Sequence, residues 1–215
     1  MTKATELTDD GLLGRMIAGD EEAFTLLYRR RYPPIYRFAL HMSGNPAVAE
    51  DVAQEVFMTL IRDAKRFDPA RGTLGGFLFG IARNFLRKRW EQDRRLVAFV
   101  GDADDLSESA AGNKPASRNG SYGGGNAHGA HLAGRDEFTT IETIGRVRQA
   151  ISTLPENYRE VVILCELEEM SYEEAASALA CPVGTVRSRL HRARGILLEK
   201  LRDARAARRA PAVGA

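Results

Sequence analysis

The chain has 215 residues, of which 44% are hydrophobic and 28% charged, and its net charge at pH 7 is +2. This length suits one large or two small globular domains. It contains no apolar run long enough to cross a bilayer, and its first ten residues lack the apolar stretch of a secretory signal. Its two cysteines, Cys165 and Cys181, are too few for a disulfide framework, so we expect a reduced, cytoplasmic protein.

The charges are unevenly distributed along the C-terminal third. Residues 156–174 hold seven acids against one base, whereas residues 187–209 hold nine bases against two acids. A one-sided basic segment of this kind fits a polyanionic partner such as nucleic acid. An ordinary solvated helix end would account equally well for the last few arginines.

The segment from residue 8 to residue 95 has the pattern of helices joined by short turns, which indicates an all-α fold. Asp9 or Asp10 is expected to cap a short first helix. Gly19 and Asp20 are expected to end that helix and to cap a second one.

Prolines divide this helical segment further. Pro33 and Pro34 are expected to kink or interrupt the second helix, because proline lacks the N–H that a helix interior needs. Asn45 and Pro46 have the pattern of an N-cap followed by a first helical residue, so a third helix should begin there and run to about Arg66.

The third helix has two distinct faces. Its core face carries Val48, Val52, Ala53, Val56 and Leu60. A separate arc carries Asp51, Gln54, Glu55, Met58 and Arg62. Carboxylates and an amide around an exposed methionine can dock on a partner helix, although a merely solvated surface has the same pattern.

A fourth helix should begin after a loop over residues 67–73, with Thr73 as its cap, and should run to about Arg95. Its polar arc is basic, with Arg83, Asn84, Arg87, Lys88, Arg94 and Arg95. Aromatic residues lie nearby in the sequence at Phe67, Phe79 and Trp90. Basic and aromatic side chains together can hold a nucleic-acid strand and stack its unpaired bases. The alternative is that the phenylalanines are core residues, as we expect for Phe77 and Phe85.

Residues 171–194 have the pattern of a helix-turn-helix. Ser171 and Glu174 form a capping box, which starts one short helix. Pro182 suits the first turn of a second helix, which should begin at Val183 or Thr185.

The second of these helices also has two faces. Its buried stripe is expected to contain Val186, Leu190, Ala193 and Leu197. Its outward face carries Gly184, Ser188 and His191, flanked by Arg187 and Arg192. Small residues beside hydrogen-bonding side chains are what a recognition helix in a major groove requires. An ordinary surface helix with solvated arginines is the alternative.

Residues 102–134 are dominated by Gly, Ser, Ala and Asn, and we expect them to form a flexible tether. His128 and His131 have a spacing that some metal sites use, but neither cysteines nor carboxylates lie close by, so we expect no metal. The sequence has no Ser-His-Asp constellation, P-loop or dinucleotide fingerprint. We therefore expect a protein without catalytic activity or cofactor.

Four motifs together resemble the extracytoplasmic-function (ECF, group IV) sigma factors of bacterial RNA polymerase. The resemblance covers about residues 9–95 (the sigma-2 domain) and about residues 141–201 (the sigma-4 domain). The motifs are AEDVAQEVF at 49–57, IARN at 81–84, LPENYREVV at 154–162 and CPVGTVRSRL at 181–190. Each motif is modest alone, but all four in this order are specific.

The resemblance implies three sets of site residues. Core-polymerase binding would involve Asp51, Gln54, Glu55, Phe57 and Met58. Binding of the −10 promoter element would involve Phe67, Arg71, Arg83, Asn84, Arg87 and Lys88. Binding of the −35 element would involve Thr185, Arg187, Ser188, His191 and Arg192.

The resemblance also implies a domain plan and partners. The expected parts are an N-terminal tail (1–8), a sigma-2-like domain (9–96), a flexible linker (97–138), a sigma-4-like domain (139–203) and a basic tail (204–215). The implied partners are core RNA polymerase, through its β′ clamp and β flap, promoter DNA and an anti-sigma factor, with no membrane insertion. The implied function is promoter recognition and melting at transcription initiation, as part of a stress response.

Two other classes of protein fit parts of the sequence. A stand-alone helix-turn-helix regulator would explain residues 171–194 but neither the docking arc of the third helix nor the basic fourth helix. A helical metalloenzyme using His128 and His131 would explain less.

Overall fold

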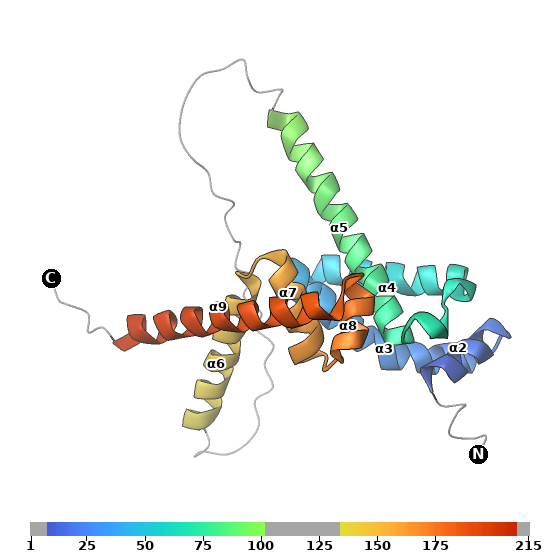
Figure 1. Ribbon diagram of the computed structural model, residues 1–215, viewed down its shortest axis with the longest axis horizontal. Helices are drawn as coiled ribbons and strands as arrows, with labels where there is room; N and C mark the ends of the chain where they lie inside the picture. The colour runs from blue at the N-terminus through green and yellow to red at the C-terminus, as the bar shows by residue number, and fades with distance from the viewer. Residues whose placement is uncertain (1–7, 102–133, 210–215) are drawn as a thin grey trace.

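The computed structural model describes residues 8–101 and 134–209, and within these ranges every regular element is a helix (Figure 1). The N-terminal half contains α2 (Asp9–Ile17), α3 (Glu21–Ser43), α4 (Pro46–Asp63), the short 3₁₀ turns Ala64–Arg66 and Pro69–Arg71, and α5 (Leu74–Gly101). The C-terminal half contains α6 (Gly134–Ser152), α7 (Glu156–Val162), a π-helical turn (Ile163–Leu167), α8 (Tyr172–Leu179) and α9 (Val183–Arg209). The expectation of an all-α fold is confirmed.

The ends of several helices follow the expected capping residues. Asn45 caps α4, where its Oδ1 accepts from the backbone N–H of Ala47 at 2.9 Å, and Pro46 occupies the first turn. Thr73 precedes α5, and its hydroxyl accepts from the N–H of Gly76 at 3.2 Å. Such side chains satisfy N–H groups that have no partner within the helix.

Asp9 and Asp10 do not cap α2 as expected. Thr8 is the cap, and its hydroxyl accepts from the N–H of Gly11 at 3.2 Å. Both aspartates lie in the first helical turn instead, where a carboxylate interacts favourably with the helix dipole. The side chain of Asp9 is thereby free to pair with Arg30 of α3 at 2.8 Å.

The interruption expected as one outcome of Pro33 and Pro34 is absent, because α3 continues through both prolines. A proline inside a helix costs about 3 kcal/mol. Burying one large apolar side chain stabilises the folded state by about 1.5–3 kcal/mol. Leu27 on one side of the prolines and Ile35 and Phe38 on the other are at most 1% exposed, so packing holds both flanks in one helix.

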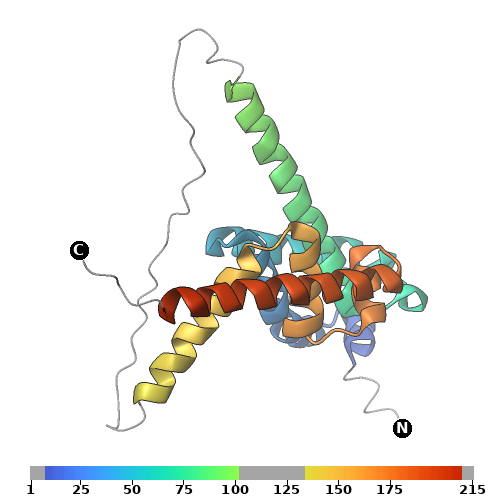
Figure 2. The same cartoon turned by 60° about the vertical axis from the view of Figure 1, so that its left-hand side comes forward.

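α5, α6 and α9 extend from the body of the molecule and determine its overall shape (Figure 1). The N-terminal part of α5 packs in the body, and its C-terminal part projects away from it, as Figures 1 and 2 both show. α5 reaches Gly101 and α6 begins at Gly134, so both helices extend into the range predicted as linker. The rest of that range, with His128 and His131, lies outside the described residues.

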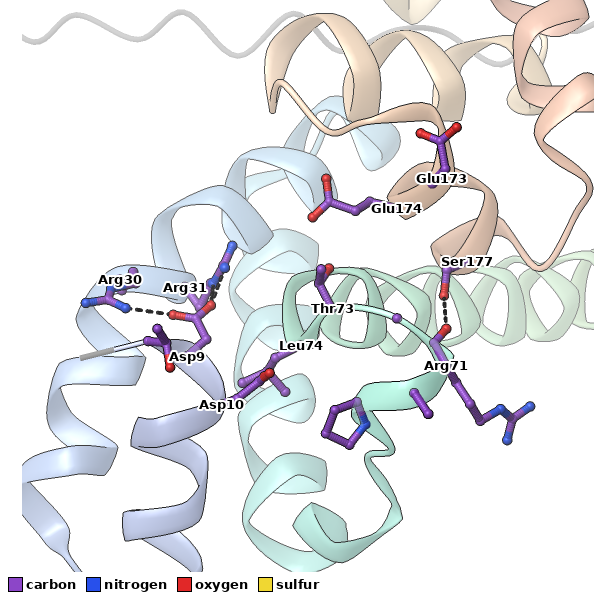
Figure 3. Close-up of a pocket in the computed structure, with 14 residues that line it drawn as sticks. Asp9, Asp10, Arg30, Arg31, Arg71, Thr73, Leu74, Glu173, Glu174 and Ser177 are labelled. Carbon is purple, nitrogen blue, oxygen red and sulfur yellow. Dashed lines mark hydrogen bonds and ion pairs between the residues drawn. The ribbon is translucent and has the colours of Figure 1, made fainter. Parts of the chain in front are cut away.

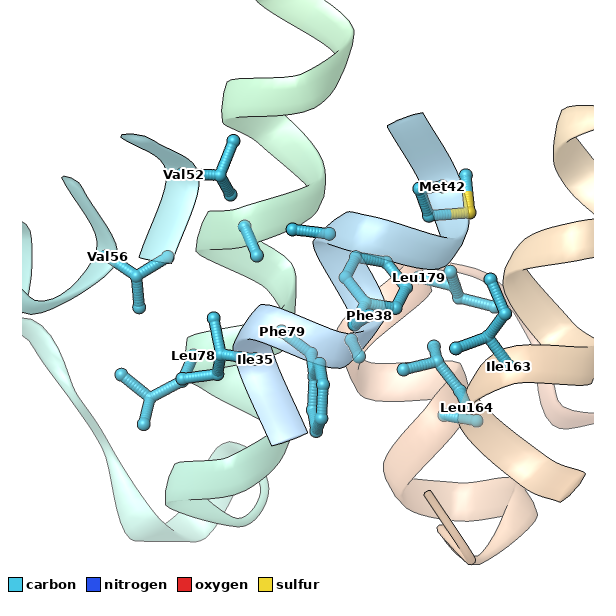
Figure 4. Packing of buried hydrophobic residues seen from close by; sticks show 14 of the residues in the cluster. Ile35, Phe38, Met42, Val52, Val56, Leu78, Phe79, Ile163, Leu164 and Leu179 are labelled. Atoms are coloured by element: carbon cyan, nitrogen blue, oxygen red, sulfur yellow. The ribbon is translucent and has the colours of Figure 1, made fainter. Parts of the chain in front are cut away.

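The two halves share one hydrophobic core. Phe38 and Met42 of α3 lie beside Ile163 and Leu164 of the π-helical turn and Leu179 of α8 (Figure 4). All five side chains are at most 2% exposed. α8 also packs along α5. The sequence indicated two helical units, but its patterns gave no sign that they would pack on each other.

None of the helices in residues 8–101 and 134–209 combines the length and the apolar character that crossing a membrane would need.

Candidate nucleic-acid interface

The turn between α8 and α9 is built by local interactions. The backbone N–H of Ser171 donates to Glu174 Oε2 at 3.0 Å, and the N–H of Glu174 donates to the Ser171 hydroxyl at 3.2 Å, so the expected capping box is present. α8 ends at Ala180 in the left-handed conformation, with φ of 50°. Pro182 follows, and α9 starts at Val183. The helix-turn-helix predicted from these residues is therefore formed.

α9 presents a polar face to solvent. Val186, Leu190 and Ala193 are at most 1% exposed and anchor the helix, while Leu197 is half-buried. The residues expected at the −35 element lie on the other side, with Arg187, Ser188, His191 and Arg192 exposed and Thr185 half-buried. These side chains therefore form one face of α9 that is open to solvent.

Two internal contacts restrain side chains on this face. The Arg187 guanidinium lies 5.7 Å from the centroid of the Tyr172 ring, a cation–π distance. The Ser188 hydroxyl donates to the carbonyl of Thr185 at 3.1 Å. Both contacts are compatible with exchange for a base or a phosphate, because both lie at the surface.

The loop before α5 forms one wall of a cavity of about 500 Å³. Asp68 accepts from the N–H of Ala70 at 3.0 Å and shapes the loop. The ring centroids of Phe67 and Phe77 are 5.6 Å apart, and both residues line this cavity. The cavity is lined by residues 66–68, 71–73, 76–77, 80–81 and 83–84, and by three residues of the C-terminal half, Ser177, Ala178 and Ala180.

Arg83, expected at the −10 element, is held by the C-terminal half. Its Nε donates to Oε1 of Glu160 at 2.6 Å, and the side chains are only 14% and 1% exposed. The second oxygen of Glu160 is buried and has no hydrogen-bond partner among residues 8–101 and 134–209. Burial raises the pKa of Glu160, and the adjacent Arg83 opposes this rise. The other polar residues expected at the −10 element are exposed, namely Arg71, Asn84, Arg87 and Lys88.

α8 lies close against the loop and the first turns of α5. The Ser177 hydroxyl donates to the carbonyl of Arg71 at 3.2 Å (Figure 3). A Cβ placed on Gly80 would lie 3.4 Å from the carbonyl oxygen of Ala178, and one on Gly76 would lie equally close to that of Glu174. Glycine at these two positions permits the close approach of the two helices.

A second hollow opens between the halves on the other side of the loop. It has a volume of about 760 Å³ and is lined by Asp9, Arg30 and Arg31 from the N-terminal half and by Glu173, Glu174 and Ser177 from α8 (Figure 3). Asp9 pairs with both arginines. The charges of Asp9, Arg30 and Arg31 are therefore balanced within the N-terminal half.

The polar arc of α4 is open to solvent. Asp51, Gln54, Glu55 and Met58 are exposed, and Asp51 accepts from Arg89 of α5 at 3.0 Å. Phe57 differs from the others, because it is 3% exposed. Its ring lies 4.7 Å from that of Tyr28, inside an aromatic cluster with Phe24 and Tyr32. Phe57 thus supports the surface from beneath.

Sequence reasoning missed the residues that join the two halves. Glu168 accepts two hydrogen bonds from Arg37, one from Nε to Oε1 at 2.9 Å and one from Nη2 to Oε2 at 2.5 Å. Arg159 donates to the carbonyl of Met42 at 2.9 Å. The only signal was the acidic composition of residues 156–174, which does not say what those acids face.

The comparisons with known proteins agree with this geometry. Residues 27–96 match the family Sigma-70 region 2, and residues 144–197 match Sigma-70, region 4. The chain is 32% identical over 189 residues to the ECF RNA polymerase sigma factor SigW of Bacillus subtilis, covering 86% of this chain and 92% of that protein. It is 33% identical over 201 residues to the ECF RNA polymerase sigma-E factor of Escherichia coli, covering 91% and 95%.

Solved structures of two related proteins resemble the present fold. The sigma factor RpoE, solved with the anti-sigma factor NepR from Bartonella quintana, matches with a TM-score of 0.57 at 27% identity, over 83% of this chain and 96% of that chain. CnrH, solved with the cytosolic domain of CnrY, matches with a TM-score of 0.60 over 91% and 97% of the two chains. At 23% identity, the second likeness supports the fold alone.

Proposed function

The chain belongs to the extracytoplasmic-function sigma factors of RNA polymerase, and from that membership we propose how its surfaces divide the work of promoter recognition. As an alternative sigma factor it binds core RNA polymerase and directs it to promoter DNA. In the proposed division, α9 reads the −35 element, the loop before α5 and the basic arc of α5 engage the −10 element, and the polar arc of α4 binds the polymerase.

The observation that carries this proposal is the open face of α9. Arg187, Ser188, His191 and Arg192 share one exposed face, while the opposite face is anchored in the core. A recognition helix places such residues in the major groove, where arginine reads guanine and other contacts position the backbone.

The loop residues and the basic arc are suited to single-stranded DNA. The paired rings of Phe67 and Phe77 offer an aromatic surface, and Arg71, Asn84, Arg87 and Lys88 offer charge and hydrogen bonds. Stacking on an aromatic ring contributes about 1–3 kcal/mol per base. Such binding offsets part of the cost of melting the duplex, and no catalytic group or cofactor is required of the chain for this role.

Each small surface alone is expected to bind weakly, and core polymerase raises the affinity by holding the surfaces together. Two weak sites that are held together on one large partner bind with a high effective concentration. Asp51, Gln54, Glu55 and Met58 form the proposed docking arc, with the β′ clamp as its partner and the β flap as the partner of the C-terminal half. Because it acts with core polymerase, we place the protein in the cytoplasm, and regulation by an anti-sigma factor follows the related RpoE–NepR pair.

Run-off transcription with purified core polymerase on a library of genomic promoter fragments tests the function. Transcripts with a shared pair of upstream elements are expected, and their absence with pure holoenzyme would refute the proposal. A stand-alone regulator would produce none and would bind paired half-sites as a dimer.

Two substitutions test the residue assignments. Arg192→Ala should weaken promoter binding by about 1–3 kcal/mol if Arg192 reads a base edge. If it contacts only phosphate, the loss should be uniform across sequences and the salt slope should fall by about one. Arg202→Ala, an exposed arginine further along α9, is the matched control and should have neither effect.

Asp51→Arg should prevent co-purification with core polymerase while leaving the helical content unchanged. Glu22→Arg reverses an exposed acid at the start of α3 and should not affect co-purification. Equal retention of both variants on core polymerase would remove α4 from the proposed interface.

A further inference from the structure

Tyr172, the first residue of α8, has no role in the function proposed above, yet its ring lies beside Arg187 of α9. The ring is held from two sides. The capping box of Ser171 and Glu174 fixes the backbone at the start of α8, and the half-buried ring packs against the hydrophobic core. Tyr172 therefore offers a rigid aromatic surface to its neighbour.

Arg187 lies over this surface. Its guanidinium carbon is 5.7 Å from the centroid of the Tyr172 ring, within the range of a cation–π contact. The side chain of Arg187 is otherwise exposed, and a free arginine side chain loses much rotamer entropy when it is immobilised. Contact with a fixed ring removes part of that freedom before DNA binds, which lowers the cost of binding.

Arg194 holds the other end of the tyrosine. It lies seven residues after Arg187, which places it about two turns further along the same side of α9. Its Nε and Nη2 donate to Oε1 of Glu166 at 3.0 and 2.5 Å, and its guanidinium also hydrogen-bonds the Tyr172 side chain. The pair of Glu166 and Arg194 thus restrains the hydroxyl end of Tyr172, while Arg187 lies over the ring.

A guanidinium that stacks on a ring keeps its hydrogen-bond donors available. The N–H groups of arginine lie in the plane of the guanidinium, whereas an aromatic ring interacts with the face of that plane. Arginine reads guanine in the major groove through two of these N–H groups, which donate to O6 and N7. Tyr172 can therefore stay in contact with Arg187 while Arg187 binds a base.

We propose that Tyr172 is a positioning residue for promoter recognition, which orients Arg187 so that this arginine reads a guanine of the −35 element. The proposal rests on the assignment of α9 to the −35 element. Tyr172 acts through Arg187 and makes no base contact of its own. Arg192 shares the exposed face but has no comparable ring contact among residues 8–101 and 134–209. Only the base read by Arg187 should therefore depend on Tyr172.

Three variants separate positioning from packing. Tyr172→Leu keeps an apolar side chain against the core but removes the ring. Tyr172→Phe keeps the ring and removes only the hydroxyl. The matched control is Tyr158→Leu, which makes the same exchange at a half-buried tyrosine of α7 that packs on the same core but is not in contact with Arg187.

Each full-length variant is assembled with core polymerase, and its affinity is measured at one salt concentration. The probes are a promoter identified by run-off transcription and every single-base change of its −35 element. Tyr172→Leu should weaken binding to the unchanged promoter about two- to fivefold, which corresponds to an exposed cation–π contact of about 0.5–1 kcal/mol. Tyr172→Phe should bind like the wild type, and Tyr158→Leu should keep the wild-type base preference.

Arg187→Ala completes a double-mutant cycle with Tyr172→Leu. This variant identifies the base that Arg187 reads, because changes of that base no longer alter its affinity. On promoters changed at that base, Tyr172→Leu and the wild type should bind equally. In the Arg187→Ala background, Tyr172→Leu should cause no further loss.

Three results would overturn the positioning role. A loss that is uniform across all base changes, or that adds to the loss from Arg187→Ala, would mean that Tyr172 supports α8 or contacts the DNA backbone itself. Equal losses in Tyr172→Phe and Tyr172→Leu would assign the effect to the hydroxyl. Tighter binding by Tyr172→Leu would mean that the ring keeps Arg187 away from DNA.

The same measurements separate this inference from the proposed function. If the wild-type holoenzyme initiates transcription and Arg187→Ala loses preference for one base, the assignment of α9 to the −35 element stands whatever Tyr172→Leu shows. If Arg187→Ala keeps every base preference of the wild type, the role of Tyr172 and the base contact of Arg187 are both refuted.

Discussion

The two DNA-facing helices differ in what the rest of the chain does to them. α9 keeps Arg187, Ser188, His191 and Arg192 in solvent, whereas α5 has Arg83 closed beneath Glu160 and its first turns covered by α8. Both helices have a basic face and an apolar face. The difference shows that a periodic pattern identifies a functional face but does not reveal whether another element covers it.

The largest expected contrast between the two helices comes from removing one arginine from each. Arg83→Ala leaves the carboxylate of Glu160 buried and unpaired, which costs about 3–5 kcal/mol in comparable buried pairs. Arg187→Ala removes an exposed side chain and should change the free energy of unfolding by no more than about 0.5 kcal/mol. Urea denaturation followed by circular dichroism measures both.

The double variant Arg83→Ala/Glu160→Gln is the control for this contrast. Removing the charge of Glu160 should recover much of the lost stability, because the unpaired carboxylate is the main cost. If Arg83→Ala proves as mild as Arg187→Ala, the Arg83–Glu160 pair does not hold the halves together.

Replacing one glycine in each helix tests how closely α5 and α9 are packed against other elements. Gly80 of α5 lies against α8, whereas a Cβ on Gly195 of α9 would meet no atom within 4 Å. Gly80→Leu should separate α8 from α5 at a cost of about 1–3 kcal/mol of overpacking. Gly195→Leu should raise stability by up to about 1 kcal/mol, because leucine favours a helix more than glycine does.

Thermal unfolding measures these opposite signs. For a chain of this size, 1 kcal/mol shifts the midpoint by about 2–4 °C. A rise for both variants would mean that α8 yields to a larger side chain at little cost and that close packing on Gly80 does not matter.

The parts of the fold that the sequence predicts are decided within a few residues. The cap at Asn45, the capping box at Ser171 and the buried stripe at Val186 and Leu190 each depend on neighbours less than two turns away. Helix periodicity also separated the exposed arc of α4 from its buried face. Periodicity placed most of the expected site residues on polar faces, and the resemblance to the sigma factors implied their roles.

The rest depends on partners that are distant in the sequence. Arg83 and Glu160 are 77 residues apart, and Arg37 and Glu168 are 131 apart. The continuity of α3 through Pro33 depends on the core on both of its sides. The position of Phe57 beneath the arc is likewise set by rings on α3 that are distant in the sequence.

Loss of the capping box at Ser171 should have a smaller effect that is confined to α8, the helix that covers the first turns of α5. Ser171→Ala removes the acceptor for the N–H of Glu174 and should cost about 1 kcal/mol. Because α8 packs on α5, amide hydrogen exchange should increase in residues 172–179 first. Ser188→Ala, which removes an exposed hydroxyl bonded within α9, should leave exchange in that range unchanged. Equal exchange in both variants would show that packing on α5 alone holds α8 in place.

The smallest expected effect is a pH dependence at the contact between the halves. His41 of α3 has a pKa below its usual value because of burial first, and then because of Arg148 on α6 and Arg37. The folded protein therefore favours neutral His41. The resulting stability is fully present above the ordinary histidine pKa of about 6.5 and is lost as pH falls through the lower folded value.

Glu160 and Glu168 act in the opposite direction. Burial raises the pKa of both carboxyl groups, so acidification favours the folded form at these two positions. The contribution of His41 is therefore read as the difference between the wild type and His41→Asn in urea unfolding at about pH 7.5 and about pH 5.5. The wild type should lose more stability than His41→Asn between these conditions, while His191→Asn, on the open face of α9, should follow the wild type. Parallel losses of stability in all three proteins would mean that His41 does not take part in the contact between the two halves. The contrast between α9 and α5 would then rest only on the carboxylates that face α3 and α5.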